Sequence, residues 1–189
     1  MRRAMLAMAL VALASALAGC GAAGWGGGGK PLYRVSAAAE RDYVDGNGCV
    51  WKADQAYSEA AKWGCLGGLT IRRTEITSLP GTKAPDVYLT ERYSMDGYRF
   101  DVPNGVYAVR LHFAETYDGI TAAGERIFTV KIQGAEAIKD LDVLKEAGKF
   151  ATPLVKEVTG IEVTDGKLLI EFVANVQNPE INGIEVFGQ

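Results

Sequence analysis

The 189-residue chain contains one histidine and three cysteines, and it has no long run of basic residues. A single histidine excludes a zinc site built from cysteine and histidine pairs. His112 lies in an alternating strand pattern without a recognisable serine or cysteine nucleophile, so we expect a solvent-facing or hydrogen-bonded strand residue. The segment Asp45–Gly48 carries oxygen ligands at alternate positions, but no glutamate closes it as a calcium loop. The sequence therefore predicts neither a metal site nor a cofactor.

Long hydrophobic runs are also missing, except for one near the start. Two arginines precede the apolar stretch Ala4–Ala16, which is too short to span a bilayer comfortably. The sequence Leu-Ala-Gly-Cys over Leu17–Cys20 follows, and small residues before a cysteine are typical of a bacterial lipobox. We predict a lipoprotein signal peptide over residues 1–19 and lipid attachment at Cys20. An ordinary secretory signal with an incidental cysteine is the alternative.

A glycine-rich stretch follows the predicted lipid site, and we interpret residues 20–31 as the lipidated cysteine and a tether. The remaining residues, 32–189, have the size of one domain. The lipid would place this domain at the membrane surface of the cell envelope. Gly21 differs from the aspartate that commonly retains lipoproteins at the inner membrane, which favours the outer membrane.

Without the signal peptide, 18 Lys and Arg residues face 23 Asp and Glu residues, a formal net charge of −5. An acidic domain without a basic patch argues against nucleic acid as a partner. Cys49 and Cys65 remain once Cys20 is assigned to lipid. Because the predicted compartment is oxidising, they are a candidate disulfide pair.

The domain consists of short alternating segments typical of β-strands. The clearest is Val106–Phe113, in which every second residue is large and apolar, and Ile127–Ile132 is another. Turn residues Pro103–Gly105 join the first of these to a preceding strand, and Asp165-Gly166 stands between two more; both patterns predict hairpins.

Only Leu141–Ala147 suggests a helical turn, with Asp142 as its N-cap and Gly148 at its end. Many short antiparallel strands predict an all-β fold, a jelly-roll β-sandwich of two antiparallel sheets with a short helical turn.

No catalytic constellation stands out. Glycoside hydrolysis needs two carboxylates beside the sugar, and the candidates are Glu91, Asp96, Glu115 and Asp118. Acidic residues at strand ends are common, so we predict that the chain is not an enzyme. Aromatic side chains beside polar ones are more informative, because sugars present flat C–H faces and rims of hydroxyl groups. Trp63, Tyr93 and Tyr117 have such surroundings, although core packing is the alternative for each.

Four ordered motifs closely resemble the malectin family of carbohydrate-binding domains, and together they cover nearly the whole domain. These are Val87–Tyr93 (VYLTERY), Leu111–Tyr117 (LHFAETY), Lys139–Val143 (KDLDV) and Asn178-Pro179. The resemblance implies a jelly-roll sandwich, a sugar site formed by loops at one end, and a non-catalytic role.

The resemblance also carries binding residues to individual positions. Tyr93 and Tyr117 match two binding aromatics, and Trp63 is a candidate for a third. Two positions depart from the pattern of the family's namesake: Asp118 replaces a second aromatic after Tyr117, and Gln177 replaces an acidic residue before Asn178-Pro179. These departures leave the identity of the sugar open.

The predicted function is therefore non-catalytic binding of an oligo- or polysaccharide, which could contain glucose. Tyr93, Tyr117 and Trp63 would stack against sugar rings, and Asp118, Gln177 and Asn178 would form hydrogen bonds. A structural or protein-interaction module on the same sandwich, with a protein partner at the envelope, is the first alternative. A small carbohydrate-active hydrolase that uses Glu115 and Asp118 is the second.

Overall fold

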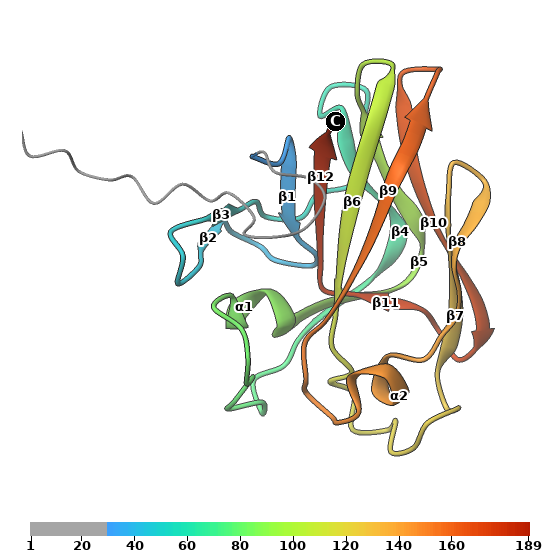
Figure 1. The fold of residues 1–189 in the computed structure, drawn as a ribbon. Helices are drawn as coiled ribbons and strands as arrows, with labels where there is room; N and C mark the ends of the chain where they lie inside the picture. The colour runs from blue at the N-terminus through green and yellow to red at the C-terminus, as the bar shows by residue number, and fades with distance from the viewer. Residues whose placement is uncertain (1–29) are drawn as a thin grey trace, which may run out of the picture.

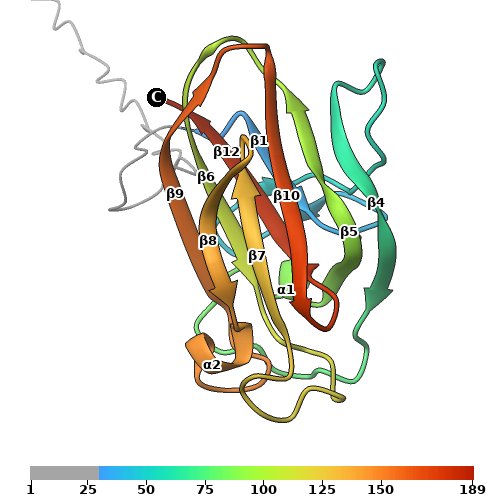
Figure 2. The same ribbon diagram turned by 90° about the vertical axis from the view of Figure 1, so that its right-hand side faces the viewer.

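The computed structural model describes residues 30–189, which fold into a β-sandwich (Figures 1 and 2). The predicted signal peptide, Cys20 and nearly all of the predicted tether lie outside the described residues. The described part contains twelve strands and two short helices. All strand pairs in the two sheets of the sandwich are antiparallel, which confirms the predicted fold class.

The smaller sheet has four strands in the order β1-β12-β6-β9, with the bounds β1 Tyr33–Ser36, β12 Gly183–Gly188, β6 Gly105–Phe113 and β9 Leu154–Val163. The larger sheet has the order β11-β5-β10-β7-β8. Strand β4 pairs with β5 along the edge opposite the one that β10 and β11 share. The bounds in this sheet are β4 Trp63–Arg72, β5 Thr90–Asp101, β7 Ile127–Ile132, β8 Ala135–Leu141, β10 Lys167–Val176 and β11 Glu180–Ile181. A separate two-stranded ribbon consists of β2 Tyr43–Val44 and β3 Val50–Trp51.

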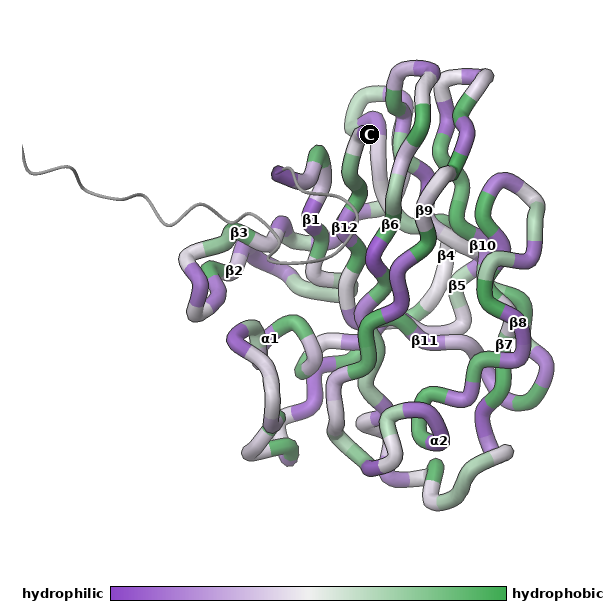
Figure 3. The backbone as a smooth tube through the Cα atoms, viewed as in Figure 1, coloured by the Kyte–Doolittle hydropathy of each residue, from purple (hydrophilic) through white to green (hydrophobic). Residues whose placement is uncertain are grey.

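The core lies between the two sheets and follows from the alternating pattern of the sequence. Hydrophobic and hydrophilic positions alternate along the long strands (Figure 3). Phe128 of β7 contacts Phe113 of β6, with ring centres 5.9 Å apart, so the two sheets meet directly through aromatic side chains. Fully burying an aromatic or large aliphatic side chain contributes about 1.5–3 kcal/mol, and many such residues are fully buried here.

Both predicted hairpins are wrong, because each turn joins strands of different sheets. The turn at Pro103-Asn104 leads from β5 in the larger sheet to β6 in the smaller one, and the turn around Asp165-Gly166 leads from β9 back to β10. The two turns contact each other: the Gly166 amide donates to the Asn104 side chain, at 2.9 Å. Turn residues determine where the chain reverses, but they do not determine which strand the next strand pairs with.

The predicted helical turn is confirmed as α2, Val143–Ala147. Asp142 caps it by accepting a hydrogen bond from the Lys145 amide, and Gly148 ends it with a left-handed φ of 74°. Helix α1, Pro85–Tyr88, was not predicted. Both helices lie toward the end of the sandwich opposite the turns at 103–104 and 164–166 (Figure 1).

The candidate disulfide between Cys49 and Cys65 is absent, because Cys65 is a free cysteine. Its side chain belongs to the core beneath β4, packed with the residues of the larger sheet, and burial raises the pKa of the thiol.

His112 is a buried, hydrogen-bonded strand residue. Its two ring nitrogens lie 2.9 Å from the Tyr88 hydroxyl and 3.1 Å from a Glu185 carboxylate oxygen. Of the two environments predicted for this residue, the hydrogen-bonded one is therefore present and the solvent-facing one is not.

Candidate functional site

A pocket of about 300 Å³ lies at the helix-bearing end of the sandwich, where four chain segments converge. Each segment contributes two residues. Ile71 and Arg73 come from the end of β4 and the residue after it, and Glu91 and Tyr93 come from the start of β5. Tyr117 and Arg126 belong to the β6–β7 connection, and Gln177 and Asn178 belong to the β10–β11 connection.

Strand β5 places two of these side chains in the pocket by simple alternation. Glu91 and Tyr93 are two residues apart and therefore point to the same face of the sheet. Tyr93 pairs with Glu180 of β11, and the amide of Ser94 donates to the carbonyl of Pro179, which holds the β10–β11 connection against β5.

Tyr117 forms an exposed aromatic wall of the pocket, with 40% of its surface accessible. The guanidinium carbons of Arg73 and Arg126 lie 5.4 Å and 6.0 Å from the centre of its ring, within cation–π range. A Cβ atom at Gly119 would lie 2.5 Å from the ring, so a larger residue there would require the ring to shift. The ring lies against two buried cations and close to the Gly119 backbone.

A buried cluster of charges forms the floor of the pocket. Arg73 donates to Glu91 at 3.1 Å, and Thr116 donates to the same carboxylate at 3.1 Å. Arg126 lies between two carboxylates, 3.6 Å from Glu91 and 3.4 Å from Glu115. Removing one partner of such a buried pair is costly because it leaves a charge unpaired away from water. The contacts of Arg126 with the two carboxylates are ion pairs without hydrogen bonds.

A third carboxylate, Glu180, is completely buried beside this cluster, and neither of its oxygens has a hydrogen-bond partner among the described residues. Burial, together with the charges of Glu91 and Glu115, raises the pKa of Glu180 well above its usual range. Burial also raises the pKa of Glu115, although Arg126 opposes the shift. A neutral Glu180 leaves two arginines balanced by two carboxylates.

Four of the six residues predicted to bind sugar meet in this pocket: Tyr93, Tyr117, Gln177 and Asn178. Asp118 does not line it and lies instead in a neighbouring groove.

The structure does not bring Trp63 into this pocket. Trp63 pairs with Phe100 at the start of β4, whereas Tyr93 pairs with Leu69. The six residue steps along β4 from Trp63 to Leu69 correspond to about 20 Å. The Trp63 ring packs against Phe100 and Tyr33, with ring centres 6.2 Å and 6.1 Å apart. Core packing, the alternative considered for this residue, is therefore its role in the structure.

Sequence reasoning missed the charged half of the pocket. Arg73 and Arg126 are isolated basic residues with no motif around them, and their convergence depends on contacts that are distant in the chain. Glu91 lies in the Glu-Arg-Tyr motif, so its position two residues before Tyr93 was an available signal.

The carboxylates of the hydrolase alternative do not face a common cavity. Glu115 is buried beneath Tyr117, whose amide donates to it at 3.0 Å, and Asp118 lies in the neighbouring groove. Within residues 30–189, no three histidine, cysteine or acidic side chains are grouped so that they could hold a metal ion. No helix of this part of the chain is long and apolar enough to cross a membrane.

A β-sandwich whose end loops surround a small polar and aromatic pocket is the fold of malectin-like domains, which serve as carbohydrate-binding domains and receptor ectodomains. The chain belongs to the malectin domain family, whose model matches residues 32–188. Malectin domains are non-catalytic carbohydrate-binding domains.

Among curated proteins, the chain is similar to Malectin-B of Xenopus laevis, with 27% identity over 154 residues. That match covers 80% of this chain and 52% of the frog protein, so the chain spans about half the length of this relative.

Two solved structures illustrate the range of proteins that contain this fold. The β-glucuronidase of Bacteroides uniformis matches with a TM-score of 0.75 and 26% identity, over 83% of this chain and 18% of the enzyme. The complex of the plant peptide RALF23 with FER and LLG2 matches with a TM-score of 0.69 and 23% identity, over 84% of this chain and 48% of the plant chain. The similarity to the plant chain concerns the fold alone.

Proposed function

We propose that the domain binds a carbohydrate, without chemical conversion, in the pocket between Tyr93 and Tyr117. One observation carries the proposal: two tyrosines and two side-chain amides, predicted from the sequence, line the same 300 Å³ pocket. Aromatic faces suit the C–H surface of a sugar ring, and the amides of Gln177 and Asn178 offer both donors and acceptors to its hydroxyl groups. The family membership supports the same function.

Backbone conformation at the pocket also favours a binding role. Ser94 and Gln177 both have left-handed φ values, 56° and 59°, which are uncommon for residues other than glycine. Such a backbone conformation holds the Gln177 side chain, and the neighbouring Tyr93, in positions that relaxed backbone would not provide.

A lipid at Cys20 would hold the domain at the surface of a membrane of the cell envelope, and the sequence favours the outer membrane. The proposed role is the capture of oligo- or polysaccharide there. Acyl chains contribute about 0.8 kcal/mol for each buried methylene group, so a lipid anchor would be firm.

A protein or peptide partner is the second candidate. The observation that favours it is the likeness of the fold to the plant structure solved with the RALF23 peptide. The two departures at Asp118 and Gln177 would then mark a site that no longer serves sugars.

A glycan-array screen tests the proposal. The full-length chain in detergent is compared with a Tyr93→Ala, Tyr117→Ala double variant and with Tyr57→Ala. Tyr57 is a partly buried aromatic that pairs with Cys65 near the other end of β4 and does not line the pocket. We expect the parent and the Tyr57 variant to bind the same glycans and the double variant to lose them.

The other outcomes are equally informative. If no glycan binds, carbohydrate binding is wrong and the protein partner becomes the better hypothesis. Equal binding by all three proteins would place the sugar outside this pocket. Release of reducing ends from a polysaccharide would show that the domain is an enzyme.

A further inference from the structure

One edge of the larger sheet is only half covered, and the proposed function does not use it. Strand β4 pairs with β5 on one side and forms an outer edge of the sandwich on the other (Figure 2). Residues 55–57 cover the first half of this edge: the Cys65 amide donates to the Gln55 carbonyl at 2.8 Å, and the Tyr57 amide donates to the Cys65 carbonyl at 3.0 Å. The covering segment runs parallel to β4, so the edge already accepts one extended piece of the chain.

The second half of the edge, residues 68–72, has no such cover. The Arg73 amide donates to the Leu89 carbonyl at 2.8 Å, and the backbone groups of successive residues in an antiparallel pair point to alternate sides. The amides and carbonyls of Thr70 and Arg72 therefore point away from β5. No hydrogen bond joins these four groups to any of residues 30–189.

The open half also lacks the protection that exposed sheet edges usually have. Such edges are normally guarded by charged side chains or by a covering segment. Lys52 covers β1 on its outer side, and the edge strands β8 and β9 each carry three charged residues. Residues 67–71 of β4 carry no charge, and 57% of the Leu69 surface is exposed. The result is an uncharged, exposed row of unpaired backbone donors and acceptors.

The surroundings of the open half suit a slender partner. A hollow of about 450 Å³ adjoins it, lined by residues 70–72 of β4 and by residues 38–43 of the β1–β2 connection. A second copy of β4 is poorly suited to this position, because the segment 55–57 covers half of its own edge. A short extended peptide meets no such obstacle.

The charges around this hollow select neither sign. Arg72 pairs with Asp86, and Asp42 pairs with Lys52. The remaining charged lining residues are Glu40 and Arg41, one of each sign. Recognition at this edge therefore depends on backbone hydrogen bonds and on shape.

We infer that β4 binds an extended peptide segment of a protein partner by strand addition along residues 68–72. The peptide backbone exchanges hydrogen bonds with Thr70 and Arg72, as an added strand does at any open sheet edge. Every second peptide side chain lies beside Leu69 and Ile71, where apolar β-branched residues pack well. The inference goes beyond the proposed function and does not depend on it.

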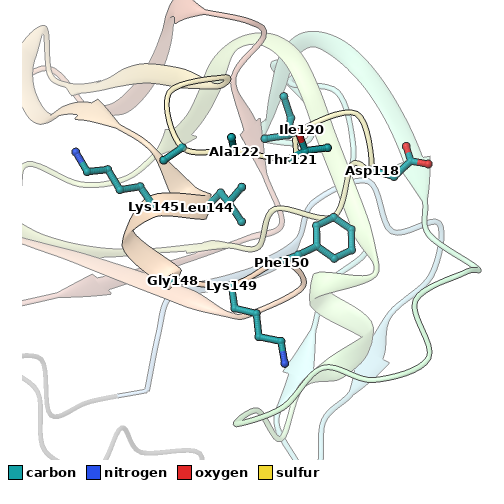
Figure 4. Close-up of a pocket in the computed structure, with 10 residues that line it drawn as sticks. Asp118, Ile120, Thr121, Ala122, Leu144, Lys145, Gly148, Lys149 and Phe150 are labelled. Atoms are coloured by element: carbon teal, nitrogen blue, oxygen red, sulfur yellow. The ribbon is translucent and has the colours of Figure 1, made fainter.

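The peptide site adjoins the sugar pocket but not the groove that contains Asp118. Ile71 lines both the pocket and the hollow beside β4. None of residues 68–72 lines the groove (Figure 4). Because the peptide would use outward-facing backbone groups of β4, either proposal can fail without the other.

The test begins with phage-displayed random heptapeptides selected on the full-length chain in detergent. We expect the enriched heptapeptides to alternate apolar and polar residues and to lack a central proline, which would remove a ladder hydrogen bond. The best heptapeptide is then synthesised and titrated by calorimetry.

Two variants of one residue locate the contact. Thr70→Pro removes an amide that points away from β5, so the pairing of β4 with β5 keeps its hydrogen bonds. This variant should lose roughly tenfold or more in affinity for the heptapeptide. Thr70→Val keeps the amide and should bind as tightly as the parent. Circular dichroism melts verify that both variants are folded.

Methylated peptides test the same contact without changing the protein. The amides of an added strand point alternately toward β4 and away from it. N-methylation of the set that faces β4 should abolish binding, and N-methylation of the other set should leave the affinity unchanged.

Three results would overturn the inference. They are a selection that enriches no heptapeptide, equal binding by the parent and Thr70→Pro, and equal binding by the two methylated peptides. A dimer of the parent that Thr70→Pro dissociates, without any heptapeptide binding, would assign the edge to a second copy instead. Glycan binding by the parent is decided separately, by the array.

Discussion

The guanidinium group of Arg73 lies 5.4 Å from the centre of the Tyr117 ring while it donates a hydrogen bond to Glu91. One buried cation thus connects the exposed wall of the pocket to its charged floor. The position of Tyr117 therefore depends on an ion pair whose two side chains also line the pocket.

Arg73→Gln should weaken both the fold and the site. It leaves Glu91 without its hydrogen-bonded cation, and breaking a buried pair costs about 3 kcal/mol. Urea denaturation measures this loss, and calorimetry with a bound glycan should show about a tenfold loss of affinity, because Tyr117 loses its support. The neighbouring Arg72 pairs with Asp86 in solvent, so Arg72→Gln should cost less than about 1 kcal/mol. Equal effects of the two variants would show that burial of the Arg73–Glu91 pair is unimportant.

Glu180→Gln should make the protein more stable at alkaline pH. The folded pKa of Glu180 is raised, so the folded state holds a proton that the unfolded chain releases above about pH 4.5. The stability of the wild type should therefore fall as the pH rises above that value, whereas glutamine, which is neutral throughout, avoids this loss.

We expect the Glu180→Gln variant to gain stability relative to the wild type as the pH rises from 4 to 8, with little difference at pH 4. The exposed Glu162, changed to Gln, is the matched control. A Glu180 variant that is less stable than the wild type at pH 8 would contradict a neutral buried carboxyl group.

Glu185 should show the opposite dependence on pH. Burial alone would raise its pKa, but the hydrogen bond and charge of His112, together with Arg34, lower it to about 2. A lowered folded pKa adds stability above the unfolded value of about 4.5, and this stability is lost as the pH falls toward 2.

The shift corresponds to about 3 kcal/mol. We therefore expect Glu185→Gln to be less stable than the wild type by an amount of that order at pH 7, and the difference to shrink between pH 4.5 and pH 2. Denaturation curves across this range measure it. A difference that stays constant with pH would mean that the charge of Glu185 is not what stabilises the fold.

Asn182 should be one of the most sensitive polar residues in the fold. Its side chain is fully buried, accepts a hydrogen bond from the Ala114 amide at 2.6 Å and donates one to the Thr90 carbonyl at 2.9 Å. Asn182→Ala leaves these backbone groups buried without partners, at a cost of about 2–4 kcal/mol by urea denaturation. The exposed Asn47 makes no side-chain hydrogen bond with the described residues, and its alanine variant should fall within about 0.5 kcal/mol of the parent.

Local features were readable from the sequence because they depend on near neighbours. The period of two predicted β6 and β7, and the capping residues Asp142 and Gly148 predicted α2. The family motifs predicted that Tyr93, Tyr117, Gln177 and Asn178 share one site, and the pocket brings these four together.

Partners distant in the chain were decided by tertiary structure alone. The turns at 103–104 and 164–166 have hairpin sequences, yet each crosses between sheets, because burying the apolar faces of both strands against the opposite sheet outweighs the pairing that a tight turn favours. Likewise, Arg73, Glu91 and Arg126 carry no mark of their association, since an ion pair requires only opposite charges brought together by packing. The sequence by itself determined the strands, the helical cap and half of the pocket. The packing of the two sheets against each other decided how the strands pair and which charged side chains lie beneath Tyr117.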